Sequence, residues 1–173
     1  TTSTLQQEAS KALNFSIQKT MRIAQQLYEG VDDKGAGTVG LITYLRTDST
    51  RVSDEAKSAA ISFISENYGE DYLQEGAAKA KANGTKVQDA HEAIRPSDIT
   101  RIPSEIKDSL SRDQFRLYQL IWKRFVASQM SNALYETVNV KIAAKNYRFT
   151  VSDSKRVFDG FMLVYTASDE EKE

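Results

Sequence analysis

The N-terminal part of the chain carries apolar residues at helical spacing. This spacing predicts two short helices, over residues 3–15 and 16–29. Hydroxyl side chains stand at the start of both stretches, and such side chains accept hydrogen bonds from the free N–H groups of a first helical turn. Ser3 or Thr4 is therefore the predicted cap of the first helix, and Ser16 the predicted cap of the second.

Two further helices are predicted in the middle of the chain. One begins after Ser53, has acidic residues in its first turn and ends near Gly69. The other begins at Ser111, which forms a capping box with Gln114. This last helix has the strongest pattern, because its apolar residues form one broad face. They are Phe115, Tyr118, Ile121, Trp122, Phe125, Val126 and Met130.

Several stretches between these helices lack a helical period. Residues 31–39 are rich in glycine and aspartate, which predicts an exposed connection, whereas residues 40–44 form a short apolar, β-like run. Residues 75–86 mix Gly, Ala, Lys and Asn, which predicts a solvated loop. Pro96 and Pro103 interrupt the chain after that loop, and Pro96 disfavours a helix beyond the residue before it.

The C-terminal part of the chain changes from a helical period to a period of two. Alternation predicts β-strands that contain Tyr135, Thr137, Val138, Val140, Ile142, Tyr147, Phe149 and Val151. Turns are predicted at residues 145–146, 152–153 and 159–160, from their Asn, Asp, Ser and Gly content. Residues 168–173 form a charged tail.

These elements predict an α+β fold with two parts. Residues 1–130 form a mainly helical domain. Residues 131–173 form two or three antiparallel strands and the charged tail, as one side of a sheet that belongs to an incomplete neighbouring domain. The open strand edge invites pairing with a second copy of the chain through residues 135–165.

Composition excludes several classes of function. The 173 residues contain no cysteine, which excludes disulfides, cysteine zinc sites and thiol nucleophiles, and the single histidine, His91, cannot build a multi-histidine centre. Lysine and arginine total 23 against 24 acidic residues, so the basic excess typical of nucleic-acid binders is missing. No signal peptide or membrane helix is predicted, and a cytoplasmic protein is expected. The chain begins without methionine, which we interpret as the start of an excised piece.

Residues 40–50 concentrate reactive side chains in one short segment. A tyrosine hydroxyl such as that of Tyr44 can attack phosphorus, but an ordinary phenol, with a pKa near 10, needs nearby positive charge or a base to do so at neutral pH. Arg46 lies two residues further and can steady the attacked phosphate from the same side of an extended segment. The same residues also fit a structural role, with Tyr44 closing a strand and Arg46 paired with Asp48.

The segment GLITYLRTDS at 40–49 resembles the active-site tyrosine motif of type IA DNA topoisomerases. TTSTLQQEA at 1–9 and HEAIRP at 91–96 resemble motifs that flank this tyrosine in the family. Residues 117–122 and 158–161 resemble later family segments, so the similarity covers nearly the whole chain. Glu92 and Arg95 in the HEAIRP block resemble the bacterial topoisomerase I branch more than the topoisomerase III branch, and reverse gyrase shares enough of the motif to stay an alternative.

The resemblance implies a role for each residue of the motif. Tyr44 is the expected nucleophile, which joins the 5′ phosphate of a cleaved DNA strand while another strand passes through the gap. Arg46 is expected to orient the scissile phosphate, and His91 to support the site. Further candidates for DNA contact or support are Thr43, Asp48 and Arg95, of which Arg95 can instead pair with Glu92.

The resemblance also implies parts that this chain lacks. Members of the family bind Mg²⁺ through an acidic N-terminal domain, whose motifs do not occur here. No metal ligands or cofactor are therefore expected in this fragment, although Mg²⁺ is expected for the full-length enzyme. The expected partners are single-stranded DNA at the cleavage site and the metal-binding and clamp domains of the same chain. Without these domains the fragment is expected to be inactive, and the enzyme is expected to be cytoplasmic and associated with the nucleoid.

Two other classes of function remain open from the residues alone. One is a noncatalytic DNA-binding module, and the other is a protein-interaction domain that docks through its terminal hairpin. Trp122 and Phe125 are interpreted as core residues rather than base-stacking residues. The cations of the Ser111 helix can form a stripe that faces DNA, but Asp113 shares the helix, and a solvated face is the preferred interpretation. These cations are Arg112, Arg116, Lys123 and Arg124.

Overall fold

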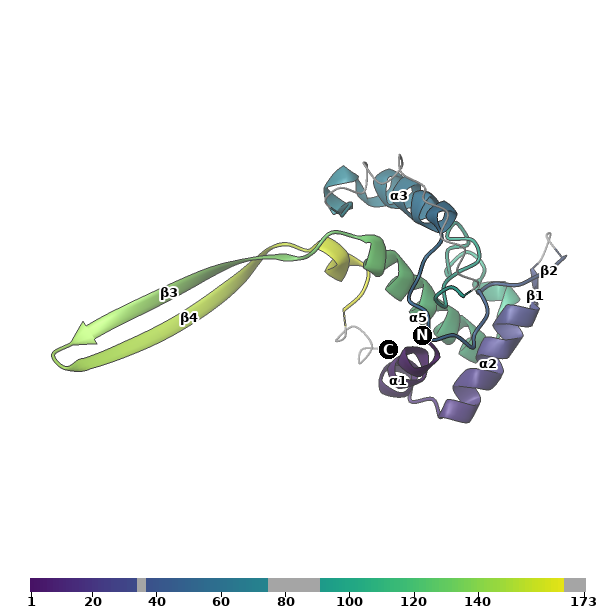
Figure 1. Cartoon of the computed structure of the whole chain (residues 1–173), viewed down its shortest axis with the longest axis horizontal. Helices are drawn as coiled ribbons and strands as arrows, with labels where there is room; N and C mark the ends of the chain where they lie inside the picture. The colour runs from purple at the N-terminus through teal and green to yellow at the C-terminus, as the bar shows by residue number, and fades with distance from the viewer. Residues whose placement is uncertain (34–36, 75–90, 167–173) are drawn as a thin grey trace.

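The fold is known from a computed structural model, which describes residues 1–33, 37–74 and 91–166. Figure 1 shows a helical body from which one long β-hairpin projects. The predicted α+β class is confirmed, with helices in the N-terminal part and strands after residue 130. The predicted loop at 75–86 and the charged tail at 168–173 lie outside the described residues.

Helices α1 (Thr2–Leu13) and α2 (Ile17–Glu29) form the first part of the body. Ser16 caps α2 as predicted. The predicted cap of α1 is wrong, because Thr1 accepts the hydrogen bond from the N–H of Thr4, at 3.3 Å. The helix can begin this early because the Thr2 hydroxyl donates to the carbonyl oxygen of Leu45, at 2.8 Å, and so fixes the first turn to another segment.

Helices α3 (Asp54–Tyr68) and α5 (Arg112–Gln129) complete the helical body. Both predicted caps are confirmed, with Ser53 at the start of α3 and the Ser111–Gln114 capping box at the start of α5. The predicted apolar face of α5 is buried except at Phe115, which is half-buried. The core role of Trp122 and Phe125 is thereby confirmed, and the Trp122 ring packs edge-on against Phe63 with centroids 5.7 Å apart.

The prediction of an exposed connection at 31–39 is right in the exposure of Asp32, Gly37 and Thr38 and wrong in the lack of regular structure. Strands β1 (Val31–Asp33) and β2 (Gly37–Val39) pair antiparallel there as a small hairpin. Val31 is buried, because the pairing satisfies its backbone and leaves its side chain free to join the core. Short 3₁₀ turns, η1 (Glu70–Tyr72) and η2 (Lys107–Ser109), connect the other elements.

The long hairpin consists of β3 (Leu134–Ala144) and β4 (Tyr147–Phe158). The turn predicted at 145–146 is confirmed, but the turn predicted at 152–153 is wrong. Ser152 and Asp153 lie inside β4, opposite Asn139 and Val138. Polar residues do not interrupt this strand because both faces of the ribbon are exposed, so neither position has to be apolar.

The hairpin returns to the helical body without a third strand. Residues 159–160 end β4 as predicted, but the apolar residues after them form the 3₁₀ turn η3 (Gly160–Leu163). The N–H of Phe161 donates to the carbonyl oxygen of Ser131, at 2.8 Å, which closes the base of the hairpin beside the end of α5. The sheet after residue 130 therefore has two strands among the described residues.

No helix within the described ranges is long and apolar enough to span a membrane.

Candidate active site

The buried face of α5 fixes the segment that supports the site. The indole N–H of Trp122 donates to the carbonyl oxygen of Ile99, at 2.9 Å, and the Tyr118 hydroxyl donates to that of Arg101, at 2.8 Å. Both side chains are buried, so these hydrogen bonds satisfy polar atoms that water does not reach. Burial raises the pKa of Tyr118, which keeps this hydroxyl protonated as a donor.

The segment before Tyr44 lies against residues 93–97. The N–H of Thr43 donates to the carbonyl oxygen of Arg95, at 2.9 Å, and the Thr43 hydroxyl donates to that of Ala93, at 2.8 Å. Ile42 and Pro96 form an isolated antiparallel bridge. The predicted β-like run at 40–44 is thus only a single bridge, because Pro96 has no N–H with which to extend a ladder.

Thr43 fixes the position of the backbone immediately before Tyr44. The Thr43 hydroxyl also accepts from the N–H of Arg95, at 3.0 Å, so both of its hydrogen-bonding functions are used within the chain. This engagement holds the backbone on one side of Tyr44.

Tyr44 projects from this anchored segment towards solvent. Its side chain is 50% exposed, and its ring meets the Tyr28 ring edge-on, with centroids 5.5 Å apart. The tyrosine borders a depression of about 390 Å³, whose walls come from segments that are far apart in the sequence. The other lining residues are Tyr28, Thr43, Thr47, Arg51, His91, Glu92 and Arg95.

Arg46 lies on a neighbouring depression of about 570 Å³. Leu45 is buried between Tyr44 and Arg46, and both of these flanking side chains are exposed. The backbone here bends rather than extends, and it is held by Thr2, whose N–H donates to the carbonyl oxygen of Thr47 at 2.9 Å. Tyr44 and Arg46 thus face adjacent depressions rather than a common one.

The side chains around Arg46 leave its charge unneutralised. Asp48 and His91 border the same depression, but Arg46 forms no ion pair with any residue in the described ranges. The pairing of Arg46 with Asp48, considered from the sequence, is therefore not found. A guanidinium in this state can bind an incoming anion without first breaking an internal contact.

Arg95 is engaged within the protein. Its Nε and Nη2 both donate to one carboxylate oxygen of Glu92, at 2.9 and 2.7 Å. A third hydrogen bond runs from Nη1 to the carbonyl oxygen of Pro96, at 3.0 Å. The Arg95 side chain is only 14% exposed, so this arginine fixes the wall of the depression and offers little of its charge to a ligand.

Arg51 is a site residue that sequence reasoning missed. It borders the Tyr44 depression, its Nη2 lies 3.9 Å from Glu92, and its Nε donates to the carbonyl oxygen of His91, at 3.4 Å. Arg51 lies seven positions after Tyr44 and no periodicity links them, so only the folded chain brings them together.

His91 joins the two depressions. It is exposed, and it is one of two residues, with Thr47, that border both the Tyr44 and the Arg46 depressions. The backbone beside it is fixed by the N–H of Ala93, which donates to the carbonyl oxygen of Arg51 at 2.8 Å. An imidazole at this position can donate a hydrogen bond to an anion held between the two depressions.

The described residues do not fit a divalent metal site. No group of three or more Asp, Glu, His or Cys side chains converges anywhere in the described ranges. Near Tyr44, Glu92 already accepts two hydrogen bonds from Arg95. A magnesium ion needs several oxygen ligands, so carboxylates for such an ion have to come from other residues than these.

The site as described can bind and orient a phosphate, and it presents a phenol that can attack it. Arg46, Arg51 and His91 supply positive charge or hydrogen-bond donors around Tyr44. Glu92 is the one carboxylate among the described residues that border the Tyr44 depression, and it is paired with Arg95 rather than free to act as a base. The geometry therefore supplies a nucleophile and an anion-binding surface, but not the complete acid–base chemistry of phosphoryl transfer.

Comparison with known proteins agrees with this geometry. A family model described as DNA topoisomerase matches residues 1–173. The solved structure of full-length topoisomerase I from Thermotoga maritima is similar, with 48% sequence identity and a TM-score of 0.78 over 94% of this chain. The chain spans 26% of that protein's length. The chain therefore belongs to the bacterial DNA topoisomerases of type IA.

Proposed function

We propose that Tyr44 is the nucleophile of a DNA topoisomerase that cleaves one strand at a time. The phenol oxygen of Tyr44 forms a bond to a backbone phosphorus, and the bond from that phosphorus to the 3′ oxygen breaks. The phenol loses its proton and the departing 3′ oxygen gains one. The strand is then joined to the protein through its 5′ phosphate, and the reverse reaction reseals it after another strand has passed through the gap.

The observation that carries this proposal is the position of Tyr44. Its half-exposed phenol follows a segment that is fixed by the hydrogen bonds of Thr43, and it borders a depression lined by Arg51 and His91. A fixed nucleophile loses little conformational entropy when it reaches the reacting atom. A tyrosine that served only to close a strand would not need hydrogen-bond donors such as Arg51 and His91 at the border of its depression.

Arg46 is proposed to hold and orient the scissile phosphate. Its guanidinium is exposed and unpaired within the described residues, and a bidentate contact to a phosphate stabilises negative charge that develops during attack. His91, between the two depressions, is proposed to support the same phosphate. Arg95 is proposed to act through Glu92 and the wall of the site rather than through DNA.

Acid–base help and Mg²⁺ are proposed to come from the part of the enzyme that this chain does not include. The described residues offer no group of carboxylates for a metal. We therefore propose that the fragment alone forms no covalent adduct, and that the whole enzyme relaxes negatively supercoiled DNA without ATP in the cytoplasm. Its substrate at the cleavage site is proposed to be a single strand of DNA.

The test of this proposal is a mixing experiment. The fragment is combined with a separately prepared metal-binding domain, magnesium and a labelled single-stranded oligonucleotide, and the mixture is denatured and searched for DNA-linked protein. We expect a covalent adduct with the unaltered chain and none with Tyr44→Phe, because phenylalanine keeps the ring but has no nucleophilic oxygen. Arg46→Gln is expected to form the adduct more slowly, since only the phosphate contact is lost.

The control is the fragment without the second domain, which is expected to give no adduct. Association of the two pieces is measured independently, for example by sedimentation. An adduct with Tyr44→Phe, or none with the unaltered chain once association has been confirmed, would reject Tyr44 as the nucleophile and favour a noncatalytic DNA-binding module.

A further inference from the structure

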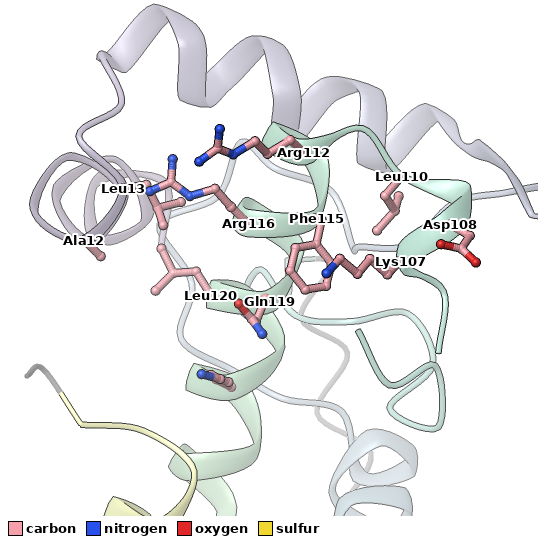
Figure 2. A pocket seen from close by; sticks show the side chains of 11 residues that line it. Ala12, Leu13, Lys107, Asp108, Leu110, Arg112, Phe115, Arg116, Gln119 and Leu120 are labelled. Atoms are coloured by element: carbon pink, nitrogen blue, oxygen red, sulfur yellow. The ribbon is translucent and has the colours of Figure 1, made fainter. Parts of the chain in front are cut away.

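A third depression, of about 610 Å³, lies beside the first half of α5 (Figure 2). Its walls come from the end of α1, the turn η2 and α5. Among the described residues, four cationic side chains border it, and Asp108 is the one carboxylate that does so. The cations are Lys107, Arg112, Arg116 and Lys123. In a chain whose net charge is −1, this is a local concentration of positive charge.

The acidic residue that argued against a DNA-facing stripe on this helix is already neutralised. The carboxylate of Asp113 pairs with the ammonium of Lys19, at 2.8 Å. Arg124, the fourth cation of the predicted stripe, pairs with Glu8 at 3.4 Å and does not border the depression. Three of the four stripe residues and Lys107 therefore remain, and none of them forms an ion pair with a residue in the described ranges.

Aromatic rings hold two of these cations in place. The Lys107 ammonium lies 5.3 Å from the centre of the Phe115 ring, and the Arg116 guanidinium lies 5.4 Å from that of Phe15. Figure 2 shows Lys107 beside Phe115, with Arg112 and Arg116 above them. A ring contact orients a cation but does not cancel its charge, so both remain able to bind an anion.

Arg112 lies at a position where a positive charge destabilises the helix. It is the first residue of α5, at the positive end of the helix dipole, where a positive charge is unfavourable and an acid is stabilising. The side chain is exposed and has no carboxylate partner among the described residues. An anion bound by Arg112, Arg116 and Lys123 together would offset this unfavourable interaction with the helix dipole.

The spacing of the cations fits a polyanion rather than a single small anion. Positions 112, 116 and 123 recur on one side of α5 and cover roughly 16 Å of its length, at about 1.5 Å per residue. A DNA strand carries a phosphate every 3.4 Å or so along a duplex, so this row can meet several phosphates in succession. The described residues that line the depression are mostly charged or apolar. None of them is a buried polar side chain that could form hydrogen bonds with the edges of DNA bases.

The basic depression is separate from the Tyr44 site. Helix α1 connects them, because Thr2 and Ser3 at its start border the Arg46 depression and Ala12 and Leu13 at its end border the basic one. The two ends of this helix are roughly 16 Å apart. A ligand in the basic depression is therefore not the phosphate that Tyr44 attacks.

We propose that the depression bordered by Lys107, Arg112, Arg116 and Lys123 binds the phosphate backbone of DNA away from the scissile bond, without reading its sequence. The identity of the polyanion as DNA rests on the proposed function. The site adds affinity and fixes the path of a DNA segment across the helical body. Its contribution falls with salt, because binding releases counterions from the phosphates.

The test measures equilibrium binding in a Tyr44→Phe background, so that covalent chemistry does not contribute. Anisotropy of a labelled single-stranded oligonucleotide is followed over a salt series. Arg112→Glu/Lys123→Glu is compared with Lys141→Glu/Lys155→Glu, which changes the net charge equally on the exposed hairpin. Loss of two phosphate contacts is expected to weaken binding about 25-fold at about 0.1 M salt and to reduce the salt slope by about 1.4.

The control pair is expected to bind DNA as the parent chain does, and far-ultraviolet circular dichroism checks that all variants remain folded. Equal losses in the two pairs, or no loss in the first, would overturn the proposal. Full displacement of the oligonucleotide by inorganic phosphate at the same phosphate concentration would overturn it too, since the site would then take small anions. These binding measurements do not depend on the adduct experiment. Rejection of Tyr44 as the nucleophile can therefore be distinguished from rejection of the basic depression as a DNA-binding site.

Discussion

Arg95 connects the chemistry of the site to its stability. Its two hydrogen bonds to Glu92 and its hydrogen bond to the carbonyl oxygen of Pro96 fix the chain at residues 92–96. This stretch lies between His91 and the bridge to the segment that carries Tyr44. The pair is well shielded, with Arg95 14% and Glu92 24% exposed. An ion pair of this kind costs more to break than a pair on the open surface, because the remaining charge is left without a partner.

Replacement of Arg95 by Gln is therefore expected to reduce the free energy of unfolding by about 1–3 kcal/mol. Urea unfolding measures this loss. The matched control is Lys57→Gln, which removes an exposed ion pair with Asp54 and is expected to change stability by less than about 0.5 kcal/mol. The double variant Arg95→Gln/Glu92→Gln is expected to recover part of the loss, and equal effects of the Arg95 and Lys57 changes would show that the shielding has no energetic consequence.

At the scale of residues, local sequence predicted some of the site and not the rest. The segment around Tyr44 was identifiable because a phenol, a guanidinium and several hydroxyls lie within one short stretch. Arg51 was not identifiable, because its contact with His91 spans 40 positions. The preference for a solvated face on α5 rested partly on Asp113, and the sequence could not show that Lys19, from a different helix, pairs with this carboxylate.

At the scale of elements, Gly160 determines how the long hairpin joins the body. Its φ is +51°, and a Cβ at this position would lie 2.4 Å from the backbone of Asn132. Both the conformation and the close approach therefore require glycine. The adjacent hydrogen bond from Phe161 to Ser131 holds the two ends of the hairpin together.

Substitution of Gly160 by Ala is expected to destabilise this junction by more than the conformational strain alone. The control is Gly37→Ala, where φ is +74° and no atom lies within 4 Å of the added carbon. That control is expected to cost about 1–2 kcal/mol, the usual penalty for a left-handed residue with a side chain. Thermal unfolding and hydrogen exchange at 131–134 compare the two, and equal losses would mean that the junction adapts to the extra carbon.

Elements governed by local rules were the most predictable. The capping residues Ser16, Ser53 and Ser111 act on N–H groups within their own first turns, so the sequence contains the whole interaction. The turn predicted at 152–153 failed because its polar residues were interpreted without knowledge of the exposed faces of the ribbon. The small β1–β2 hairpin was missed because its glycines and aspartates resemble an ordinary loop.

At the scale of the whole molecule, the long hairpin projects from the helical body, and no other described element covers its strands (Figure 1). The register places Val140, Ile142, Phe149 and Val151 on one face, and each of these is at least 43% exposed. The opposite face is polar, with Thr137 and Ser152 bonded to Ser154 and Asn139. Isolated two-stranded ribbons are only marginally stable in water, so this hairpin gains stability from any surface that covers its apolar face.

A second copy of the chain can supply such a surface. Neither long edge of the ribbon pairs with another described strand, and pairing edge to edge or face to face with a second copy removes apolar side chains from water. We expect the chain to self-associate as its concentration rises in sedimentation velocity. Ile142→Lys is expected to abolish this association, because it places a charge in the centre of the apolar face, whereas Lys141→Ala on the polar face is expected to leave it unchanged. If the Ile142→Lys variant still self-associates, the contact between copies belongs to the helical body. If the unaltered chain is monomeric at every concentration, the exposed hairpin is stable without a partner.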